Sequence, residues 1–180
     1  MKDQLKQVSD RITFASMNYR IWRIYTEPND RAKYLEVLRK YNSFFFTCIP
    51  AHFSATIITL YSLYETRHDS ISLSRLVQVT RDDKLRRELQ PILDEANNIW
   101  RKKITILRNE VYAHLSEIDF KAKFSQAEVS PNDIECLIGL SKQLANKLSY
   151  ASDRSTFAFN LDPATDTRNL LDTLLRNGSR

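Results

Sequence analysis

The stretch from Leu93 to Ser116 constrains the fold of this chain more than any other segment. It contains neither Gly nor Pro, so nothing inside it interrupts a helix. Its apolar residues recur at steps of three or four, which predicts a long amphipathic helix with one face in the core. These residues are Leu93, Ala96, Trp100, Ile104, Leu107, Val111 and Leu115. The end of this helix also carries Arg108, Asn109 and His114, three polar side chains that a core helix does not need.

The composition indicates a globular protein with long helices. The chain has 180 residues, 42% hydrophobic and 27% charged, with two Gly and five Pro. This is enough chain to bury a hydrophobic core without disulfides or metal. The formal net charge of +5 allows a polyanionic partner such as nucleic acid without requiring one. Cys48 and Cys136 lie in apolar helical patterns, so we expect both to be reduced and buried.

No apolar run approaches the length of a membrane span, and the charged N-terminus lacks the apolar segment of a signal peptide. We therefore expect a cytoplasmic protein.

The apolar periodicity predicts an all-α fold, an up-and-down helical bundle with an N-terminal helix and a C-terminal helical extension. We expect Asp30 to cap the second helix, Pro50 to kink or divide the following one, Ser70 or Ser72 to cap a short helix, and Ser130 to cap another. Beyond the central helix, the predicted helices span residues 2–25, 31–47, 51–65, about 72–80, 131–151 and 165–177. The predicted domain comprises residues 1–152, and residues 153–180 form a linker and a last helix that either docks on the bundle or reaches a partner.

The segment LRNEVYAH, which contains Arg108, Asn109 and His114, resembles the signature of the HEPN superfamily, and in particular its abortive-infection U-type branch. That signature is an Arg, a polar residue and a His near the end of a long core helix. The resemblance implies metal-independent RNA cleavage in a homodimer, in prokaryotic antiviral defence or as the toxin of a toxin–antitoxin system. It implies no cofactor and no metal, and it allows a cognate antitoxin or defence partner.

The resemblance assigns His114 as general acid or base, Arg108 as a clamp on phosphate and Asn109 as an orienting group. These residue types suit RNA cleavage, because imidazole titrates near neutral pH and guanidinium matches phosphate oxygens. On an ideal helix at about 100° per residue, Arg108 and His114 lie within roughly 65° of the centre of the apolar stripe, on opposite edges. Asn109 points away from it, so we expect two copies of the helix to be needed for one centre.

Other readings stay open for the same residues. Arg108 could pair with Glu110 on the surface, and His114 could be a cation favoured at a helix C-terminus. The chain would then be a non-catalytic helical module for nucleic acid or a partner protein, or an antitoxin or sensor that binds through its last helix. Some HEPN toxins carry a modified Tyr two residues after the His, where this chain has Ser116.

The remaining histidines and a group of basic residues could also bear on RNA binding. His52 is expected to pack between helices, and His68 is expected to lie in a loop. A group of basic residues could guide RNA or could simply be a solvated face. It comprises Lys84, Arg86, Arg87, Arg101, Lys102 and Lys103.

Overall fold

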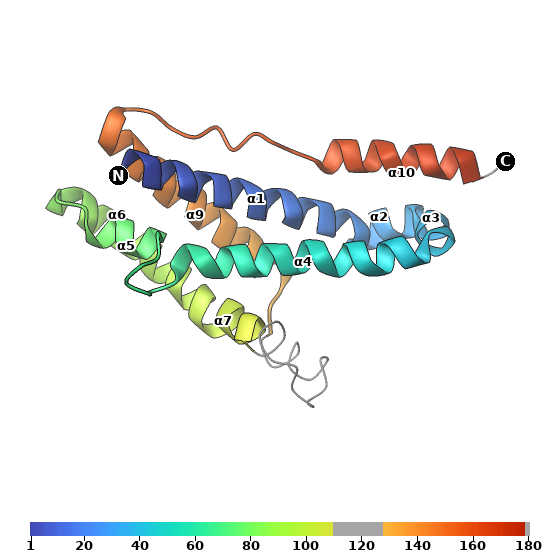
Figure 1. Ribbon diagram of the computed structural model, residues 1–180, viewed down its shortest axis with the longest axis horizontal. Coiled ribbons are helices and arrows are strands. Elements are labelled where there is room, and N and C mark those ends of the chain that lie inside the picture. Colours follow the sequence, from blue (N-terminus) through green and yellow to red (C-terminus); the bar gives the residue numbers. More distant parts are fainter. Residues whose placement is uncertain (110–127, 179–180) are drawn as a thin grey trace. The chain divides into compact units, whose positions relative to one another are not determined.

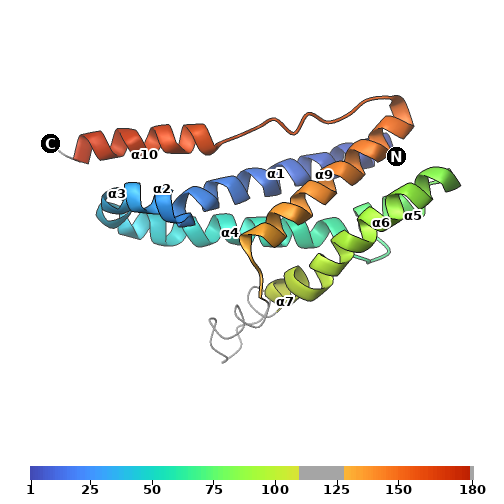
Figure 2. The same ribbon diagram turned by 180° about the vertical axis from the view of Figure 1, so that it is seen from behind.

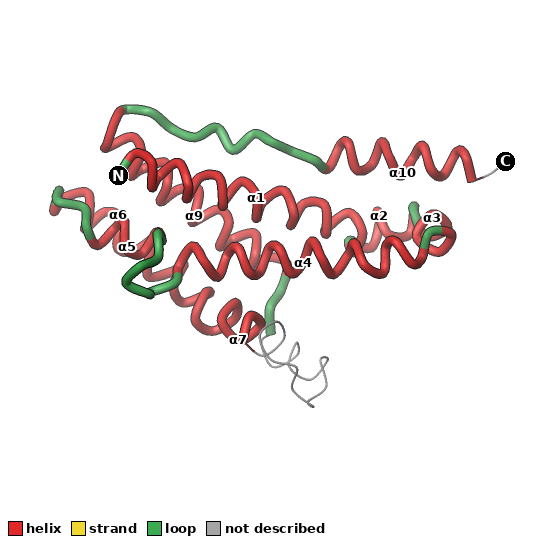
Figure 3. The backbone as a smooth tube through the Cα atoms, viewed as in Figure 1, coloured by secondary structure: helices red, strands yellow, loops and turns green. Residues whose placement is uncertain are grey.

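The computed structural model describes residues 1–109 and 128–178, and all of these residues lie in helices, turns or loops (Figure 3). This confirms the all-α prediction for the part described. The α-helices, labelled in Figure 1, are α1 Lys2–Thr26, α2 Pro28–Lys33, α3 Leu35–Lys40, α4 Asn42–Tyr64, α5 Leu73–Gln78, α6 Asp83–Ile99, α7 Thr105–Leu107, α9 Pro131–Asp153 and α10 Ala164–Gly178. A π-helical turn, Trp100–Ile104, joins α6 to α7.

The chain forms two compact units, residues 1–14 with 57–159 and residues 15–56 with 160–180. Helices α1 and α4 each contribute residues to both. The boundary predicted between residues 152 and 153 stays a prediction.

The first unit is organised around the pairing of α6 with α9, and α5 packs against both (Figure 2). A buried hydrogen bond joins the end of α4 to the middle of α9, where the Tyr64 hydroxyl lies 2.7 Å from Ser141 Oγ. The Lys103 ammonium lies 2.7 Å from the Asp133 carboxylate and ties the π turn to the first turn of α9. The core of this unit includes Leu5, Val8, Ile12, Ile57, Leu60, Leu63, Leu73, Leu76, Val77, Leu89, Leu93, Ala96, Ile104, Leu107, Ile134, Leu137, Leu144 and Leu148.

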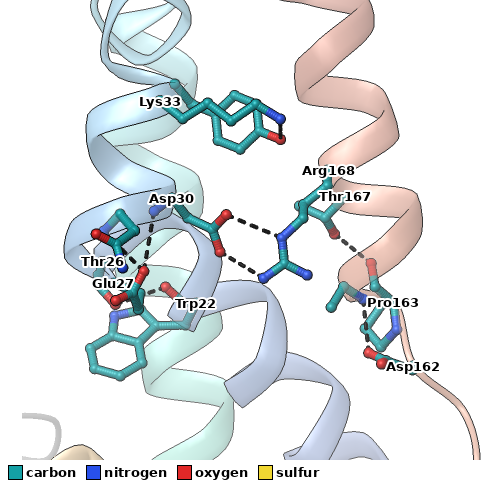
Figure 4. Close-up of polar contacts among 12 residues, drawn as sticks. Trp22, Thr26, Glu27, Asp30, Lys33, Asp162, Pro163, Thr167 and Arg168 are labelled. Atoms are coloured by element: carbon teal, nitrogen blue, oxygen red, sulfur yellow. Dashed lines mark hydrogen bonds and ion pairs between the residues drawn. The ribbon is translucent and has the colours of Figure 1, made fainter.

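The second unit holds the last helix in place. Arg168 on α10 donates two hydrogen bonds to Asp30 on α2, from Nε at 3.1 Å and Nη2 at 2.7 Å, and the two side chains face each other in Figure 4. Lys33 forms an ion pair with Asp172 at 2.8 Å. The buried core of this unit consists of Ile24, Tyr25, Tyr34, Val37, Leu38, Phe45 and Leu171. Of the two predicted alternatives for the last helix, docking within the chain is therefore the one observed.

Three predicted helix boundaries are wrong. The helix expected over 31–47 is instead α2, α3 and the start of α4, with breaks at Tyr34 and Tyr41. Pro50 lies inside α4 and does not divide it. The central helix, expected to start at Leu93, begins at Asp83 with Asp82 as its N-cap, and Pro91 lies inside α6.

The helix caps are set by local side chains. Glu27, rather than the predicted Asp30, caps α2, because its carboxylate accepts from the N–H groups of Asn29 and Asp30. The predicted caps Ser72 and Ser130 are confirmed. Ser72 accepts from the Arg75 N–H, and Ser130 forms a reciprocal capping box with Asp133.

Helix α4 exposes large apolar side chains near its start. Phe45 is buried against Tyr25, whereas Phe44 and Phe46 are 62% and 79% exposed. This helix is long and apolar enough to cross a membrane by length and composition, so the expectation that no segment reaches this length is wrong. One such helix is weak support for a membrane protein, because core helices of soluble proteins pass the same criterion. The cytoplasmic location stays a prediction.

The two cysteines differ in their surroundings. Cys48 is partly buried and Cys136 is exposed on α9, so the prediction of burial is wrong for Cys136. Both are free thiols. Burial raises the pKa of the Cys48 thiol, and partial desolvation beside the Glu95 carboxylate raises that of Cys136, so neither thiol is a ready nucleophile.

Candidate functional site

The helix that leads to Arg108 and Asn109 changes its geometry just before these two residues. Within Trp100–Ile104 the turn is π-helical, and the Thr105 N–H donates to the Trp100 carbonyl five residues earlier. Arg108 and Asn109 have π-helical geometry as well. Single π turns of this kind occur frequently at functional sites.

The π turn changes which residues share a face. In an uninterrupted α-helix Arg108 would lie eight residues beyond Trp100, about 80° away around the axis. A π turn adds about one residue to the turn, so the spacing becomes equivalent to seven residues, or about 20°. Trp100 and Arg108 therefore lie on nearly the same face. The ideal-helix angles expected from the sequence do not apply here.

Both residues contact Tyr61 on α4. The Arg108 guanidinium carbon lies 4.7 Å from the centroid of the Tyr61 ring. The Trp100 ring lies 5.5 Å from the same ring, centroid to centroid, at an interplanar angle of 35°. The Trp100 indole N–H also donates to the Tyr61 carbonyl at 3.1 Å. The aromatic pair thus fixes both the backbone and the ring on which Arg108 lies.

Asn109 contacts Arg108 directly. The Arg108 Nη1 donates to Asn109 Oδ1 at 2.9 Å, and both side chains are half-buried. A guanidinium carries five N–H donors, and this bond to Asn109 is its one hydrogen bond to a side chain in residues 1–109 and 128–178.

The remaining motif residues lie outside the described residues. This holds for His114, for Tyr112 and Ser116, and for Glu110, the acid weighed as an alternative partner for Arg108. The structure thus brings together Arg108 and Asn109 of the three predicted site residues.

Comparison with known protein families identifies the family of this chain. A family model described as AbiU2, of the HEPN type, matches residues 2–172. The chain belongs to the AbiU2 family of HEPN domains. No curated protein and no solved structure matches this chain significantly.

Membership of the AbiU2 family suggests a nuclease or an abortive-infection role, because HEPN domains are commonly ribonucleases. It also agrees with the helical bundle, since HEPN domains are all-helical. The match covers α1 and most of α10, so the AbiU2-type chain includes the last helix and not the central bundle alone.

The basic residues near the motif are only partly available to a polyanion. Lys103 is bound to Asp133, and Arg86 is paired with Asp83. Arg101 and Lys102 are exposed on the π turn. Among the solvent-facing basic side chains of residues 1–109 and 128–178, Arg101 and Lys102 lie nearest to Arg108 in sequence.

The two other histidines behave as the sequence predicts. His52 packs within the second unit, where its Nδ1–H donates to Asn18 Oδ1 at 2.8 Å, and burial lowers the pKa of its imidazole. His68 lies in the loop between α4 and α5. Among the described residues no group of three His, Cys, Asp or Glu side chains is arranged to hold a metal ion.

Sequence reasoning missed Tyr61 and the role of Trp100. Both fall in apolar periodic patterns, so the sequence indicates only packing for them. The contact of Tyr61 with Arg108 depends on the π turn, and no residue type in the segment WRKKI identifies a π turn in advance.

Proposed function

We propose that this AbiU2-family protein is a metal-independent endoribonuclease in prokaryotic antiviral defence or a toxin–antitoxin system. Arg108, Asn109 and His114 are the proposed catalytic residues. The observation that supports this most is the restrained Arg108 guanidinium, held by the Tyr61 ring and the Asn109 amide.

The chemistry needs no metal. The 2′-hydroxyl oxygen of one nucleotide attacks the adjacent phosphorus, its proton passes to a base, and the bond from phosphorus to the 5′ oxygen breaks. The leaving oxygen takes a proton, which gives a 2′,3′-cyclic phosphate and a 5′-hydroxyl end. His114 exchanges these protons, and Arg108 meets the negative charge that develops on the phosphate oxygens.

The Asn109 amide has a more specific role than the sequence assigned. Since its oxygen accepts from Nη1 of Arg108, it orients the guanidinium, and phosphate would bind the remaining N–H donors of that group. A preoriented fork loses less entropy when it binds phosphate than a free arginine does.

A homodimer completes the proposal. Two motif helices from two copies would place both imidazoles and both guanidiniums around one cationic cleft. A cognate antitoxin or defence partner would regulate it in the cell.

The test is cleavage of single-stranded RNA by the purified protein in excess EDTA. We expect cleavage by the wild-type protein and none by His114→Ala or Arg108→Ala, with unchanged helical content by circular dichroism. Asn109→Ala should retain weak cleavage. Cleavage that survives both of the first two substitutions would refute the assignment.

The second candidate function is a non-catalytic module that binds nucleic acid or a protein partner. The exposed aromatic residues of α4, Phe44 and Phe46, favour a partner surface independently of the motif. This function predicts no cleavage under any condition and a lower oligomer mass for Arg108→Ala, measured by light scattering.

A further inference from the structure

We propose that Tyr61 is a positioning residue for the active site: its ring holds the Arg108 guanidinium in the orientation that meets the phosphate. The role of the guanidinium in this inference rests on the proposed function. The way in which the guanidinium is held is given by its contacts with Tyr61 and Asn109.

The first support is the geometry of the contact. The guanidinium carbon is 4.7 Å from the ring centroid of Tyr61, within the distance at which a cation is attracted to an aromatic ring. Arg108 is half-buried, so solvent screens this attraction less than at an exposed pair.

The second support is that Tyr61 is itself fixed. Trp100 donates its indole N–H to the Tyr61 carbonyl at 3.1 Å and packs its ring against the Tyr61 ring. Leu60 and Leu63, which flank Tyr61 on α4, are fully buried, so this part of the helix is anchored in the core. A ring on a fixed backbone is a rigid support for a flexible arginine.

The third support is that the two restraints on Arg108 act together. Tyr61 lies against the guanidinium at the ring face, and Asn109 accepts one N–H at the guanidinium edge. A contact with the face fixes the plane of the group, and a hydrogen bond at the edge fixes its rotation. A guanidinium held in both ways is preorganised for a bidentate bond to phosphate.

The chain provides a matched control for this contact. Arg154 lies over the ring of Tyr150, with its guanidinium carbon 5.1 Å from the centroid. This is the same kind of pair on the exposed end of α9, outside the proposed site. Loss of the Tyr150 ring should therefore affect Arg154 alone.

The experiment compares Tyr61→Phe, Tyr61→Leu and Tyr150→Leu in the full-length protein. The first readout is the Nε–H resonance of Arg108 in a ¹⁵N-edited spectrum, assigned with Arg108→Lys. We expect the aromatic ring current to displace this resonance in the wild type and in Tyr61→Phe. The displacement should disappear in Tyr61→Leu and persist in Tyr150→Leu.

The second readout is RNA cleavage in EDTA. We expect Tyr61→Phe to match the wild type, and Tyr61→Leu to lower kcat about threefold to thirtyfold with a smaller change in KM. Tyr150→Leu should cleave like the wild type. Thermal unfolding by circular dichroism checks that Tyr61→Leu is folded.

The two readouts separate this inference from the proposed function. The inference is overturned if Tyr61→Leu is folded and changes neither the Arg108 Nε–H resonance nor kcat. It is also overturned if Tyr61→Phe loses as much activity as Tyr61→Leu. A wild-type protein that shows the displaced resonance but cuts no RNA refutes the nuclease proposal while the contact itself is confirmed.

Discussion

The hydroxyl pair of Tyr64 and Ser141 provides a quantitative test of how α4 is joined to α9. Both residues are fully buried, and Ser141 Oγ donates to the Leu137 carbonyl at 2.7 Å. Since a serine hydroxyl has one proton, Tyr64 must be the donor in the 2.7 Å contact with Ser141 Oγ. Burial raises the pKa of the Tyr64 phenol, so this donor keeps its proton at neutral pH.

The direction of the bond predicts unequal costs. Ser141→Ala leaves the Tyr64 hydroxyl buried without its acceptor, which costs about 1–3 kcal/mol of unfolding free energy. Tyr64→Phe leaves Ser141 bound to Leu137 and costs about 0.5–1.5 kcal/mol. The double variant removes donor and acceptor together, so its cost should fall below the sum of the single costs by about 1 kcal/mol.

Urea unfolding followed by circular dichroism measures all four proteins of this cycle. If the two single costs add up to the cost of the double variant within about 0.5 kcal/mol, the two hydroxyls do not interact. This result would refute the hydrogen bond between Tyr64 and Ser141.

Four other predictions follow from single contacts. Burial lowers the pKa of the His52 imidazole in the folded protein, so on acidification the unfolded chain takes up this proton at a higher pH than the folded protein does. Stability should therefore fall as the pH drops below about 6.5. Thermal unfolding at graded pH should show a smaller fall for His52→Gln. Leu171→Ala removes a buried side chain of α10 and should cost about 2–5 kcal/mol locally, seen as faster hydrogen exchange in α10. Glu27→Ala removes the cap of α2 and should cost about 1 kcal/mol by urea unfolding. A Cβ at Gly139, inside α9, meets no atom within 4 Å, so Gly139→Ala should raise stability by about 1 kcal/mol, and a lower melting temperature would contradict this.

Features that depend on local side-chain chemistry could be predicted from the sequence. The caps at Ser72 and Ser130 follow from residues that accept the first free N–H groups of a helix, and both are confirmed. The family resemblance is confirmed by a match over residues 2–172, although the eight-residue segment LRNEVYAH carries the motif.

Features that depend on tertiary contacts could not be predicted. Asp30 has the sequence context of a cap, but its carboxylate binds Arg168, 138 residues away, and Glu27 takes the cap instead. Pro50 and Pro91 are each compatible with a helix boundary or a bend, and the sequence alone does not decide between them; both helices continue through their proline. A proline costs one backbone hydrogen bond, and packing on both sides of it can outweigh that cost.

The residues proposed for the site come from the family motif, and the contacts of the guanidinium could not be predicted from ideal-helix angles. Arg108 Nη1 lies 2.9 Å from Asn109 Oδ1, in a part of the helix with π-helical geometry. The role of Tyr61 depends on the same distortion, because the π turn brings Arg108 to the face of the helix that already carries Trp100.

The most direct test of the proposed reaction uses an RNA strand with one 2′-deoxy nucleotide at a mapped cleavage site, in EDTA. Attack by the 2′-hydroxyl requires that this position is not cut, while the unmodified strand gives a 2′,3′-cyclic phosphate identified by mass spectrometry. Cleavage at the 2′-deoxy position would contradict the mechanism assigned to Arg108, Asn109 and His114.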